Sequence, residues 1–270
     1  MTKSTFYFPY IGGKNKEFDL IAHFIKFAGI DKIVEPFAGS GAFSFNCFWS
    51  GFNGDFYLND NDPFLIAFLK DVQKNGSKHY IDWTNRIIGK ELTKERHDAV
   101  IERHKTRPTL ETFFYYNKIY AFHKGLFPNR VGRRRRPFAD DIFTEIDAFF
   151  RSKHVHYSNL DYSAIFNKFK EDKRALLFLD PPYFESFNNK YYAYQNGDTP
   201  DDVRMYRDIA EFIKTCKCKV VMVVNAHEYL KELFKGYIKH TYRKRYEIPT
   251  RKKDGKVSQN KATHILVSNF

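Results

Sequence analysis

Cysteine is scarce in this chain of 270 residues, which contains only Cys47, Cys216 and Cys218. One residue separates Cys216 from Cys218, whereas redox and zinc motifs use two, and the chain has no second cysteine pair. We therefore predict reduced, structural thiols. The ten histidines show no ligand-like clustering, so we predict no metal site.

Long hydrophobic runs are also missing. No apolar stretch approaches the ~20 residues of a membrane-spanning helix, and the segment from Lys3 to Pro9 is not signal-like. We expect a protein without membrane contact, located in the cytoplasm or, for a viral source, inside the host cell. Hydrophobic residues still make up 43% of the chain, which suffices for a substantial core.

Acidic residues are outnumbered by basic ones, 32 against 45, which gives a net charge of +13. A basic surface favours a polyanionic partner, and nucleic acid is the most common one. The imbalance alone does not show where such a partner binds.

Apolar strand-like segments alternate with helical ones in most of the chain. Strands are predicted at residues 32–35, 56–59, 154–157, 175–179 and 219–224, followed by extended segments at 237–247 and 262–268. Helices are predicted at 42–49 and from Pro63, with Asp62 as the N-cap. This order predicts an α/β fold with a parallel, doubly wound sheet.

Strand patterns disappear between residues 77 and 150, where helical spacing and clustered charges dominate. We therefore predict a catalytic domain made of residues 1–76 and 151–270. Residues 77–150 are predicted to form an inserted helical domain.

A glycine-containing turn, Glu35-Pro36-Phe37-Ala38-Gly39-Ser40-Gly41, follows the first predicted strand. Glycines let the backbone approach a ligand at the carboxyl edge of such a sheet. Asp60 ends the next strand, about twenty residues on, where these folds place a ribose-binding carboxylate. The third glycine of the dinucleotide motif is missing, which disfavours a nicotinamide or flavin cofactor. A plain tight turn is the alternative.

The sequence Asp180-Pro181-Pro182-Tyr183 directly follows the most apolar predicted strand. Two prolines cannot continue a strand ladder, so they predict a rigid loop at the strand's carboxyl end. A carboxylate and a proline carbonyl there can accept hydrogen bonds from an amino group, while a tyrosine ring stacks on the base that carries it. The nitrogen lone pair is then free to attack a methyl electrophile. The alternative is a strand terminator with a packing tyrosine.

Together these motifs resemble those of the Dam-type, or D12-class, DNA adenine-N6 methyltransferases. The resemblance covers nearly the whole chain and follows the motif order of that family: Tyr10 to Lys14, Glu35 to Gly41, Leu58 to Asp60, an inserted recognition region, and Asp180 to Tyr183. It implies a Rossmann-like, S-adenosyl-L-methionine-dependent methyltransferase sheet with an inserted target-recognition domain.

The resemblance also implies roles for single residues. The cofactor contacts would come from Tyr10, Lys14, Glu35, Phe37, Gly39, Ser40, Gly41, Asp60, Asp161 and Tyr162. Among these, Lys14 would lie near the cofactor carboxylate, Asp60 would bind the ribose hydroxyls, and the pair Asp161-Tyr162 would lie near the cofactor adenine. Asp180, Pro181 and Tyr183 would hold the target adenine, which family members flip out of the duplex.

The predicted insert is the expected site of double-stranded DNA recognition. Arginine side chains match guanine edges and phosphates, and the insert concentrates them in one loop. The candidate DNA-binding residues are Asn117, Lys124, Asn129, Arg130, Arg133, Arg134, Arg135 and Arg136, with Phe127 and Phe138 as candidate wedges between bases. A solvated charge run is the alternative. GATC-specific relatives have asparagine where this chain has Lys124, so the resemblance does not imply GATC recognition.

A second basic region lies near the end of the chain, at Lys244-Arg245 and Arg251-Lys252-Lys253. These residues are interpreted either as an extension of the phosphate-binding surface or, with equal weight, as an ordinary polar hairpin.

The predicted activity is direct in-line methyl transfer from S-adenosylmethionine to adenine N6 in DNA, with a restriction endonuclease as a candidate counterpart. Catalysis is expected mainly from positioning and from hydrogen bonds by Asp180. No cysteine is placed for methylation of cytosine carbon 5. Methylation of RNA or of cytosine N4, and a catalytically idle DNA-binding module, are the alternatives.

Overall fold

A computed structural model describes residues 6–7, 14–90, 92–120, 137–182, 184, 202–251 and 257–270. For residues 120, 202, 245–251 and 257–261 only the backbone is described. The chain divides into two compact units, each considered by itself. Unit 1 comprises Met1–Phe18 and Ala38–Leu160, and unit 2 comprises Asp19–Phe37 and Asp161–Phe270.

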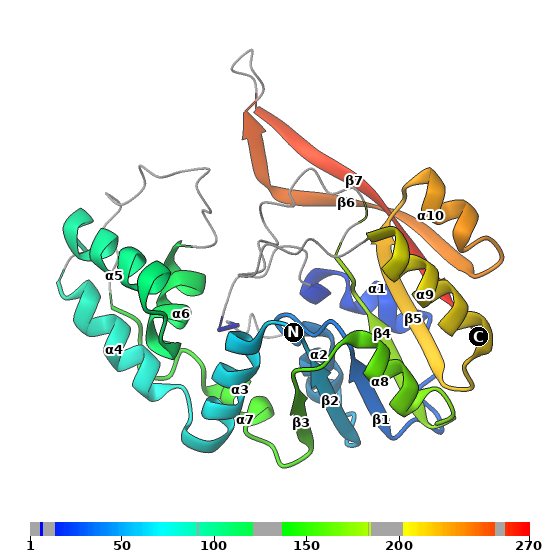
Figure 1. The fold of residues 1–270 in the computed structure, drawn as a ribbon, viewed down its shortest axis with the longest axis horizontal. Coiled ribbons are helices and arrows are strands. Elements are labelled where there is room, and N and C mark those ends of the chain that lie inside the picture. Colours follow the sequence, from blue (N-terminus) through cyan, green and yellow to red (C-terminus); the bar gives the residue numbers. More distant parts are fainter. Residues whose placement is uncertain are drawn as a thin grey trace. The chain divides into compact units, whose positions relative to one another are not determined.

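The strands belong to one seven-stranded sheet in the order β3-β2-β1-β4-β5-β7-β6 (Figure 1). Their bounds are β1 Lys32–Glu35, β2 Asp55–Asn59, β3 Val155–Ser158, β4 Ala175–Leu179, β5 Lys219–Asn225, β6 Ile238–Arg251 and β7 Val257–Ser268. In unit 2, β4 is parallel to both β1 and β5, whereas β7 is antiparallel to β5 and β6. In unit 1, β2 and β3 are parallel. The predicted α/β fold with a largely parallel sheet is therefore confirmed.

The strand interiors are the most apolar parts of the molecule. All five residues of β4 are buried, as are Val220 to Val224 in β5. Strands covered on both faces have such continuous apolar runs, whereas strands with one wet face alternate. The buried strand β4 thus fixes the position of Asp180, which directly follows its last residue.

Helices connect the strands. They are α1 Phe18–His23, α2 Ala42–Trp49, α3 Pro63–Asn75, α4 Lys78–Ile88, α5 Lys94–Thr106, α6 Leu110–Tyr115, α7 Thr144–Phe150, α8 Tyr162–Phe169, α9 Asp202–Thr215 and α10 Glu228–Leu233, with a 3₁₀ turn η1 Lys14–Lys16 and a π-helix η2 Tyr116–Tyr120. The predicted start of α3 is confirmed, because the Asp62 side chain accepts hydrogen bonds from two backbone N–H groups and Pro63 is the first helical residue. No helix in the described ranges combines the length and apolar character needed to cross a membrane.

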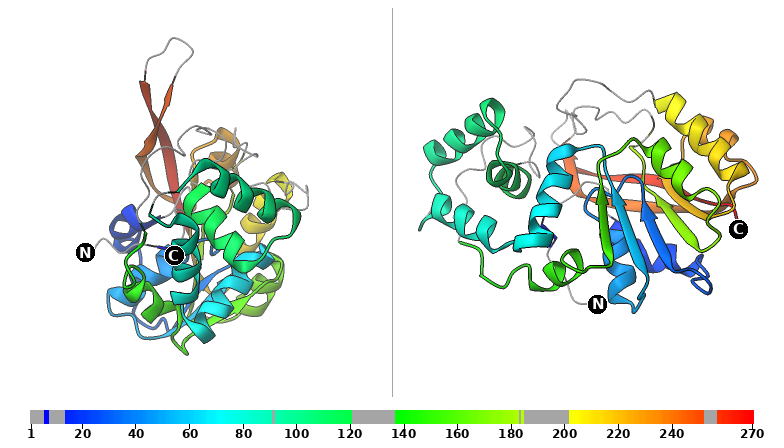
Figure 2. Two further views of the ribbon diagram at one scale, coloured as in Figure 1. Left: turned by 90° about the vertical axis from the view of Figure 1, so that its left-hand side faces the viewer. Right: turned by 60° about the horizontal axis from the view of Figure 1, so that its bottom comes forward.

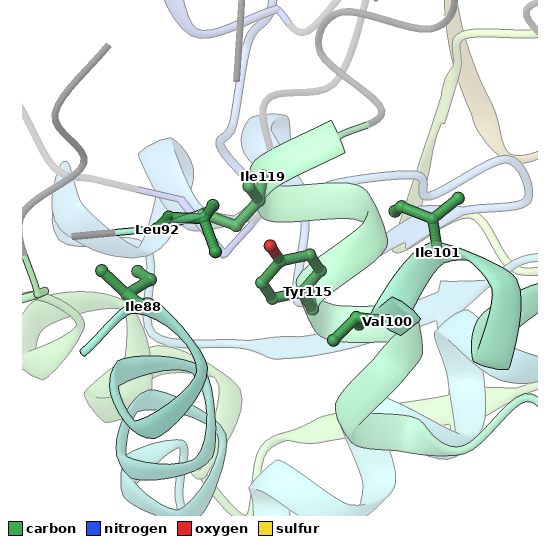
Figure 3. Close-up of a cluster of buried hydrophobic side chains, with 6 residues drawn as sticks. All are labelled: Ile88, Leu92, Val100, Ile101, Tyr115 and Ile119. Atoms are coloured by element: carbon green, nitrogen blue, oxygen red, sulfur yellow. The ribbon is translucent and has the colours of Figure 1, made fainter. Parts of the chain in front are cut away.

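The regular secondary structure of the described residues from Pro63 to Phe150 in unit 1 consists of helices without strands. Within this stretch, α4, α5, α6 and η2 surround a small core of their own, shown in Figure 3, which contains Ile88, Leu92, Val100, Ile101, Tyr115 and Ile119. A separate core is what an inserted helical domain requires. The boundaries 77 and 150 stay a prediction, and the two compact units are divided elsewhere.

The last two strands are much longer than their contact with β5. The β5–β7 pairing extends only from Asn225↔His264 to Val221↔Ser268, whereas β6 and β7 pair as far as Arg251↔Val257. The ribbon of β6 and β7 therefore continues beyond β5, as Figures 1 and 2 show from three directions. The extended segments predicted at 237–247 and 262–268 are confirmed, but the strands reach farther than the sequence pattern indicated.

Candidate active site

Asp60 lies where β2 ends in unit 1, and its carboxylate is tied to the glycine turn. Oδ2 accepts a hydrogen bond from the Gly39 N–H at 2.9 Å, and Oδ1 accepts one from the Asp62 N–H at 3.0 Å. The Ala38 N–H also donates to the Asn59 carbonyl at 2.8 Å. These bonds bring together the two motifs that the sequence placed 21 residues apart.

Burial changes the acidity of this carboxyl group. Desolvation raises the pKa of Asp60 to about 6, although the Asp62 and Gly39 N–H groups act in the opposite direction. A carboxylate has about four acceptor positions, and two backbone donors leave room for more. Asp60 can therefore accept hydrogen bonds from a pair of ligand hydroxyls, provided that it is ionised.

Glycine is required at position 41 for two reasons. Its φ of 63° lies in the left-handed region, where other residues are strained, and it caps the start of α2. A Cβ atom there would lie 3.1 Å from the Phe150 ring and 3.4 Å from Leu58. Gly39 also has a positive φ, 49°. The turn thus presents bare backbone and Ser40 at the start of a helix.

Lys14 lies in η1, and its side chain is buried. Asn46 of α2 donates one hydrogen bond to the Asn15 side chain at 2.9 Å and another to the Ala42 carbonyl. This link fastens the turn that carries Lys14 to the helix that starts at the glycine turn. Tyr10 lies outside the described residues.

Phe6 and Tyr7, the described residues before η1, are held by the helical part of unit 1. Lys118 donates to the Phe6 carbonyl at 2.8 Å and lies over the Phe143 ring at 4.7 Å. Burial lowers the pKa of Lys118 to about 8. The Tyr7 hydroxyl donates to Asp147, which also accepts from the backbone and side chain of Ser77.

Asp180 and its prolines leave the carboxyl end of β4 in unit 2. Pro181 is buried, and the Pro182 carbonyl accepts a 2.7 Å hydrogen bond from the hydroxyl of Tyr206, a fully buried residue of α9. The described residues provide no hydrogen bond to the Pro181 carbonyl. Of the two proline carbonyls, Pro181 is therefore the better candidate acceptor for an amino group.

Phe184 holds the far end of the same loop. Its carbonyl accepts from the Asn225 side chain at 3.2 Å, at the end of β5. Its ring stacks on Tyr229 with centroids 5.1 Å apart and contacts His227 and Tyr206. Tyr183 lies outside the described residues.

Unit 2 also brings Phe37 and Tyr162 together. Their ring centroids are 5.5 Å apart, and the Tyr162 hydroxyl donates to Asp208 at 2.8 Å. Desolvation and this bond raise the pKa of Tyr162. Asp161 is exposed and accepts from the Ser163 N–H as the N-cap of α8, and Glu35 is buried at the end of β1.

The predicted DNA-binding residues are only partly covered. Asn117 is half-buried, and its amide donates to the Phe113 carbonyl at 2.9 Å. The other candidates lie outside the described residues: Lys124, Asn129, Arg130, Arg133, Arg134, Arg135 and Arg136, together with the candidate wedge Phe127.

Phe138 lies beside the helical core of unit 1, and its proposed wedge role stays a prediction. Its ring packs against the helical core of unit 1, and its backbone N–H and carbonyl both bond to the Asn85 side chain. These backbone bonds anchor the chain at Phe138 to the helical part of unit 1.

Sequence reasoning missed the residues that support the Asp180 loop. Tyr206 and Asn225 follow that loop by more than twenty residues and belong to no local motif, so no spacing signal marks them. The only hint was that Asn225 ends an apolar strand at the same sheet edge. Within the described ranges, no group of three or more His, Cys, Asp or Glu residues forms a candidate metal site.

Comparison with known families defines the class of protein. Residues 10–248 match the family of D12 class N6 adenine-specific DNA methyltransferases. The chain belongs to this family, and its fold is the Rossmann-like methyltransferase fold. It is therefore a DNA adenine methyltransferase.

One relative extends over nearly the full length of both proteins. The type II methyltransferase M.CviBI of Paramecium bursaria Chlorella virus NC1A is 26% identical over 268 residues, which cover 96% of this chain and 97% of M.CviBI. A crystal structure of a candidate RNA methyltransferase from Pyrococcus horikoshii shares 10% identity, with a TM-score of 0.42, over 99% of this chain and 92% of the other. A similarity of that size supports no conclusion about this chain.

Proposed function

We propose that this adenine methyltransferase uses S-adenosylmethionine as methyl donor and modifies a flipped-out adenine of double-stranded DNA in a single in-line displacement. The supporting observation is the rigid loop at the carboxyl end of β4, where Asp180 precedes a proline whose carbonyl has no hydrogen-bond donor among the described residues. The two acceptors match the two N–H groups of the adenine amino group.

The chain's residues act by holding the base. Asp180 and the Pro181 carbonyl accept from the N6 amino group, and Tyr183 stacks on the ring, so the nitrogen lone pair is directed at the methyl group. S-adenosylmethionine supplies that methyl group on a sulfonium, which is already a good leaving group. The N–C bond would form as the C–S bond breaks and the neutral thioether leaves, and N6 would carry positive charge until one proton passes to solvent. The Asp180 hydrogen bond strengthens as that charge develops.

The donor set in unit 1 fits such a cofactor. Asp60 supplies a fixed carboxylate for two ribose hydroxyls, Gly39 and Gly41 leave the backbone accessible, and Lys14 supplies a positive charge for a carboxylate. In unit 2 we assign Phe37 and Tyr162 to the cofactor adenine, with Glu35 and Asp161 beside them. Tyr10 and Ser40 complete the proposed cofactor contacts.

We assign DNA recognition to the helical insert at 77–150, through Asn117 and the basic residues from Lys124 to Arg136. M.CviBI is a type II methyltransferase. By analogy, a restriction endonuclease of the same sequence specificity is the proposed counterpart of this chain.

The deciding experiment is transfer of a labelled methyl group from S-adenosylmethionine to duplex DNA and, separately, to RNA, followed by nucleoside chromatography. We expect the label as N6-methyladenine from duplex DNA. Label in RNA, or in N4-methylcytosine, contradicts the proposal. Absence of transfer together with cofactor binding by calorimetry would point to an idle DNA-binding protein.

A further inference from the structure

The outer part of the β6–β7 ribbon contains Lys244-Arg245 and Arg251, for which the sequence left a phosphate-binding surface and a plain polar hairpin equally open. We define the outer ribbon as residues 243–251 of β6 and 257–263 of β7, whose ladder pairing among the described strands is with each other. At ~3.3 Å per residue, seven residues of β7 extend the ribbon roughly 20 Å beyond its last pairing with β5. A two-stranded ribbon without further neighbours is only marginally stable in water, so its length needs an explanation.

The position of the outer ribbon relates it to the reaction. Asn225, the last residue of β5, pairs with His264, and the antiparallel β7 residues before His264 therefore lie beyond the carboxyl end of β5. Because β4 is parallel to β5 in the register Leu179↔Met222, Asp180 leaves the sheet at the same edge. The Ala226 N–H extends this contact by donating to the Thr263 carbonyl at 2.8 Å. The outer ribbon thus starts on the edge of unit 2 that carries the target-base loop.

The charged residues of the ribbon are nearly all basic. Among the residues of β6 and β7, six are Lys or Arg and one, Glu247, is acidic. Arg245 is paired directly with Lys261 across the two strands. Basic residues therefore occupy opposed backbone positions of the ribbon, and the excess of positive charge in the two strands favours an anionic partner.

The free edge of β6 argues against a protein strand as the partner. β6 is the last strand of the sheet, and Pro249 lacks an N–H group, as is typical of edge strands that must not pair further. Charge repulsion likewise disfavours two such ribbons pairing with one another. A polyanion remains, and DNA is the polyanion on which this family acts.

We propose that the outer ribbon is a second DNA-binding element, which contacts backbone phosphates of the duplex next to the flipped adenine through Arg243, Arg245 and Lys261. Its contacts fix position and do not read sequence. A ribbon of this length spans roughly six nucleotide steps of one strand. The inference rests on DNA as the substrate and is independent of the arginine loop in the helical insert.

The test is the triple variant Arg243→Gln, Arg245→Gln, Lys261→Gln. Its matched control is Lys170→Gln, Lys173→Gln, Lys214→Gln, three exposed lysines of unit 2 that lie near the amino ends of β4 and β5, the opposite edge. Binding of a labelled 30-base-pair duplex is measured by fluorescence anisotropy from low to high salt. Each lost phosphate contact lowers the slope of log affinity against log salt by ~0.9, so we expect a decrease of ~2.7 for the triple variant. We expect no change for the control.

Methyl transfer separates this inference from the proposed function. The triple variant should keep the wild-type kcat at saturating DNA and show a raised KM for DNA, and a charge-preserving variant, Arg243→Lys with Arg245→Lys, should keep the wild-type slope. An unchanged slope in the triple variant, or an equal loss in the control, overturns the ribbon inference. Absence of methyl transfer in the wild type contradicts the proposed function. The salt dependence of DNA binding would still show whether the outer ribbon contacts phosphates.

Discussion

Asp60 and Asp180 both follow parallel strands at their carboxyl ends, but they are held in different ways. The carboxylate of Asp60 accepts hydrogen bonds from two backbone N–H groups, those of Gly39 and Asp62. The loop that carries Asp180 is held instead through its carbonyls, by side chains of α9 and β5. Asp60 is therefore fixed by backbone groups of neighbouring turns, whereas Asp180 belongs to a loop that is held by residues far from it in the sequence.

The difference matches the two proposed tasks. A residue that binds ribose hydroxyls needs a fixed carboxylate, and backbone donors fix it without the need to order a second side chain. A loop that binds a base in the transition state must present its acceptor groups to the substrate. Its other carbonyls, those of Pro182 and Phe184, are therefore hydrogen-bonded to the protein. The comparison predicts that substitutions near Asp60 change cofactor affinity, whereas substitutions near Asp180 change turnover.

The largest effect is expected from Asp180→Ala. The hydrogen bond of Asp180 is proposed to strengthen as N6 becomes cationic, and the loss of one such group typically costs ~10²–10³-fold in kcat. Single-turnover methyl transfer with saturating DNA measures this loss, and calorimetry measures the cofactor affinity, which should change much less. Asp180→Asn keeps one acceptor oxygen and should retain more activity than Asp180→Ala. Wild-type turnover in Asp180→Ala would show that the loop is structural.

Asp60→Asn tests the other side of the comparison and should lower cofactor affinity by about 10- to 100-fold, the range of a hydrogen bond to a charged group. Because the pKa of Asp60 is raised to about 6, its ionised form is lost as pH falls through that value. Wild-type cofactor affinity, measured by calorimetry, should thus be constant above about pH 7 and fall below pH 6. Asp60→Asn should remove this pH dependence.

Asp62→Asn is the matched control for that experiment. Asparagine caps helices as well as aspartate does, and Asp62 raises the pKa of Asp60 through its charge. The control should keep its affinity and shift the pH profile to lower values. A profile that is identical in all three proteins would show that another group titrates.

Features set by neighbouring residues could be predicted from the sequence, whereas contacts between residues far apart in the chain could not. β1, α2 and β4 have the predicted bounds, because local backbone chemistry determines each of them. The spacing marked Asp60 as a candidate ribose ligand, but its hydrogen bond with the Gly39 N–H was not predicted. Tyr206 and Asn225 could not be found, since only the packing of α9 and β5 brings them to the loop. The bonds between Phe138 and Asn85 could not be found for the same reason, because the two residues are 53 positions apart.

A smaller effect is expected at the glycine turn. Gly41→Ala places a Cβ atom 3.1 Å from the Phe150 ring in addition to imposing a positive φ. Gly29 has a similar φ of 79° with no atom within 4 Å of a Cβ, which makes Gly29→Ala the matched control. The left-handed conformation alone costs about 1–2 kcal/mol of unfolding free energy. Urea unfolding should show a greater loss for Gly41→Ala than for Gly29→Ala, and equal losses would mean that Phe150 moves aside freely.

The smallest effect is expected from Tyr206→Phe, which directly tests whether side-chain hydrogen bonds position the Asp180 loop. The change keeps the buried ring against Phe184 and removes only the hydroxyl that donates to the Pro182 carbonyl. One neutral hydrogen bond contributes about 0.5–1.5 kcal/mol, so kcat should fall about 2- to 12-fold while cofactor affinity stays constant.

Tyr229→Phe is the control for Tyr206→Phe, because its ring also stacks on Phe184 while its hydroxyl accepts from Arg207 and donates to none of the described loop residues. Both variants are compared at a temperature where both are folded. If the loop is held through the Pro182 carbonyl, only Tyr206→Phe slows methyl transfer. Equal kinetics in the two variants would show that aromatic packing positions Asp180, and the contrast between a carboxylate held by backbone donors and a loop held by side-chain donors would then be wrong.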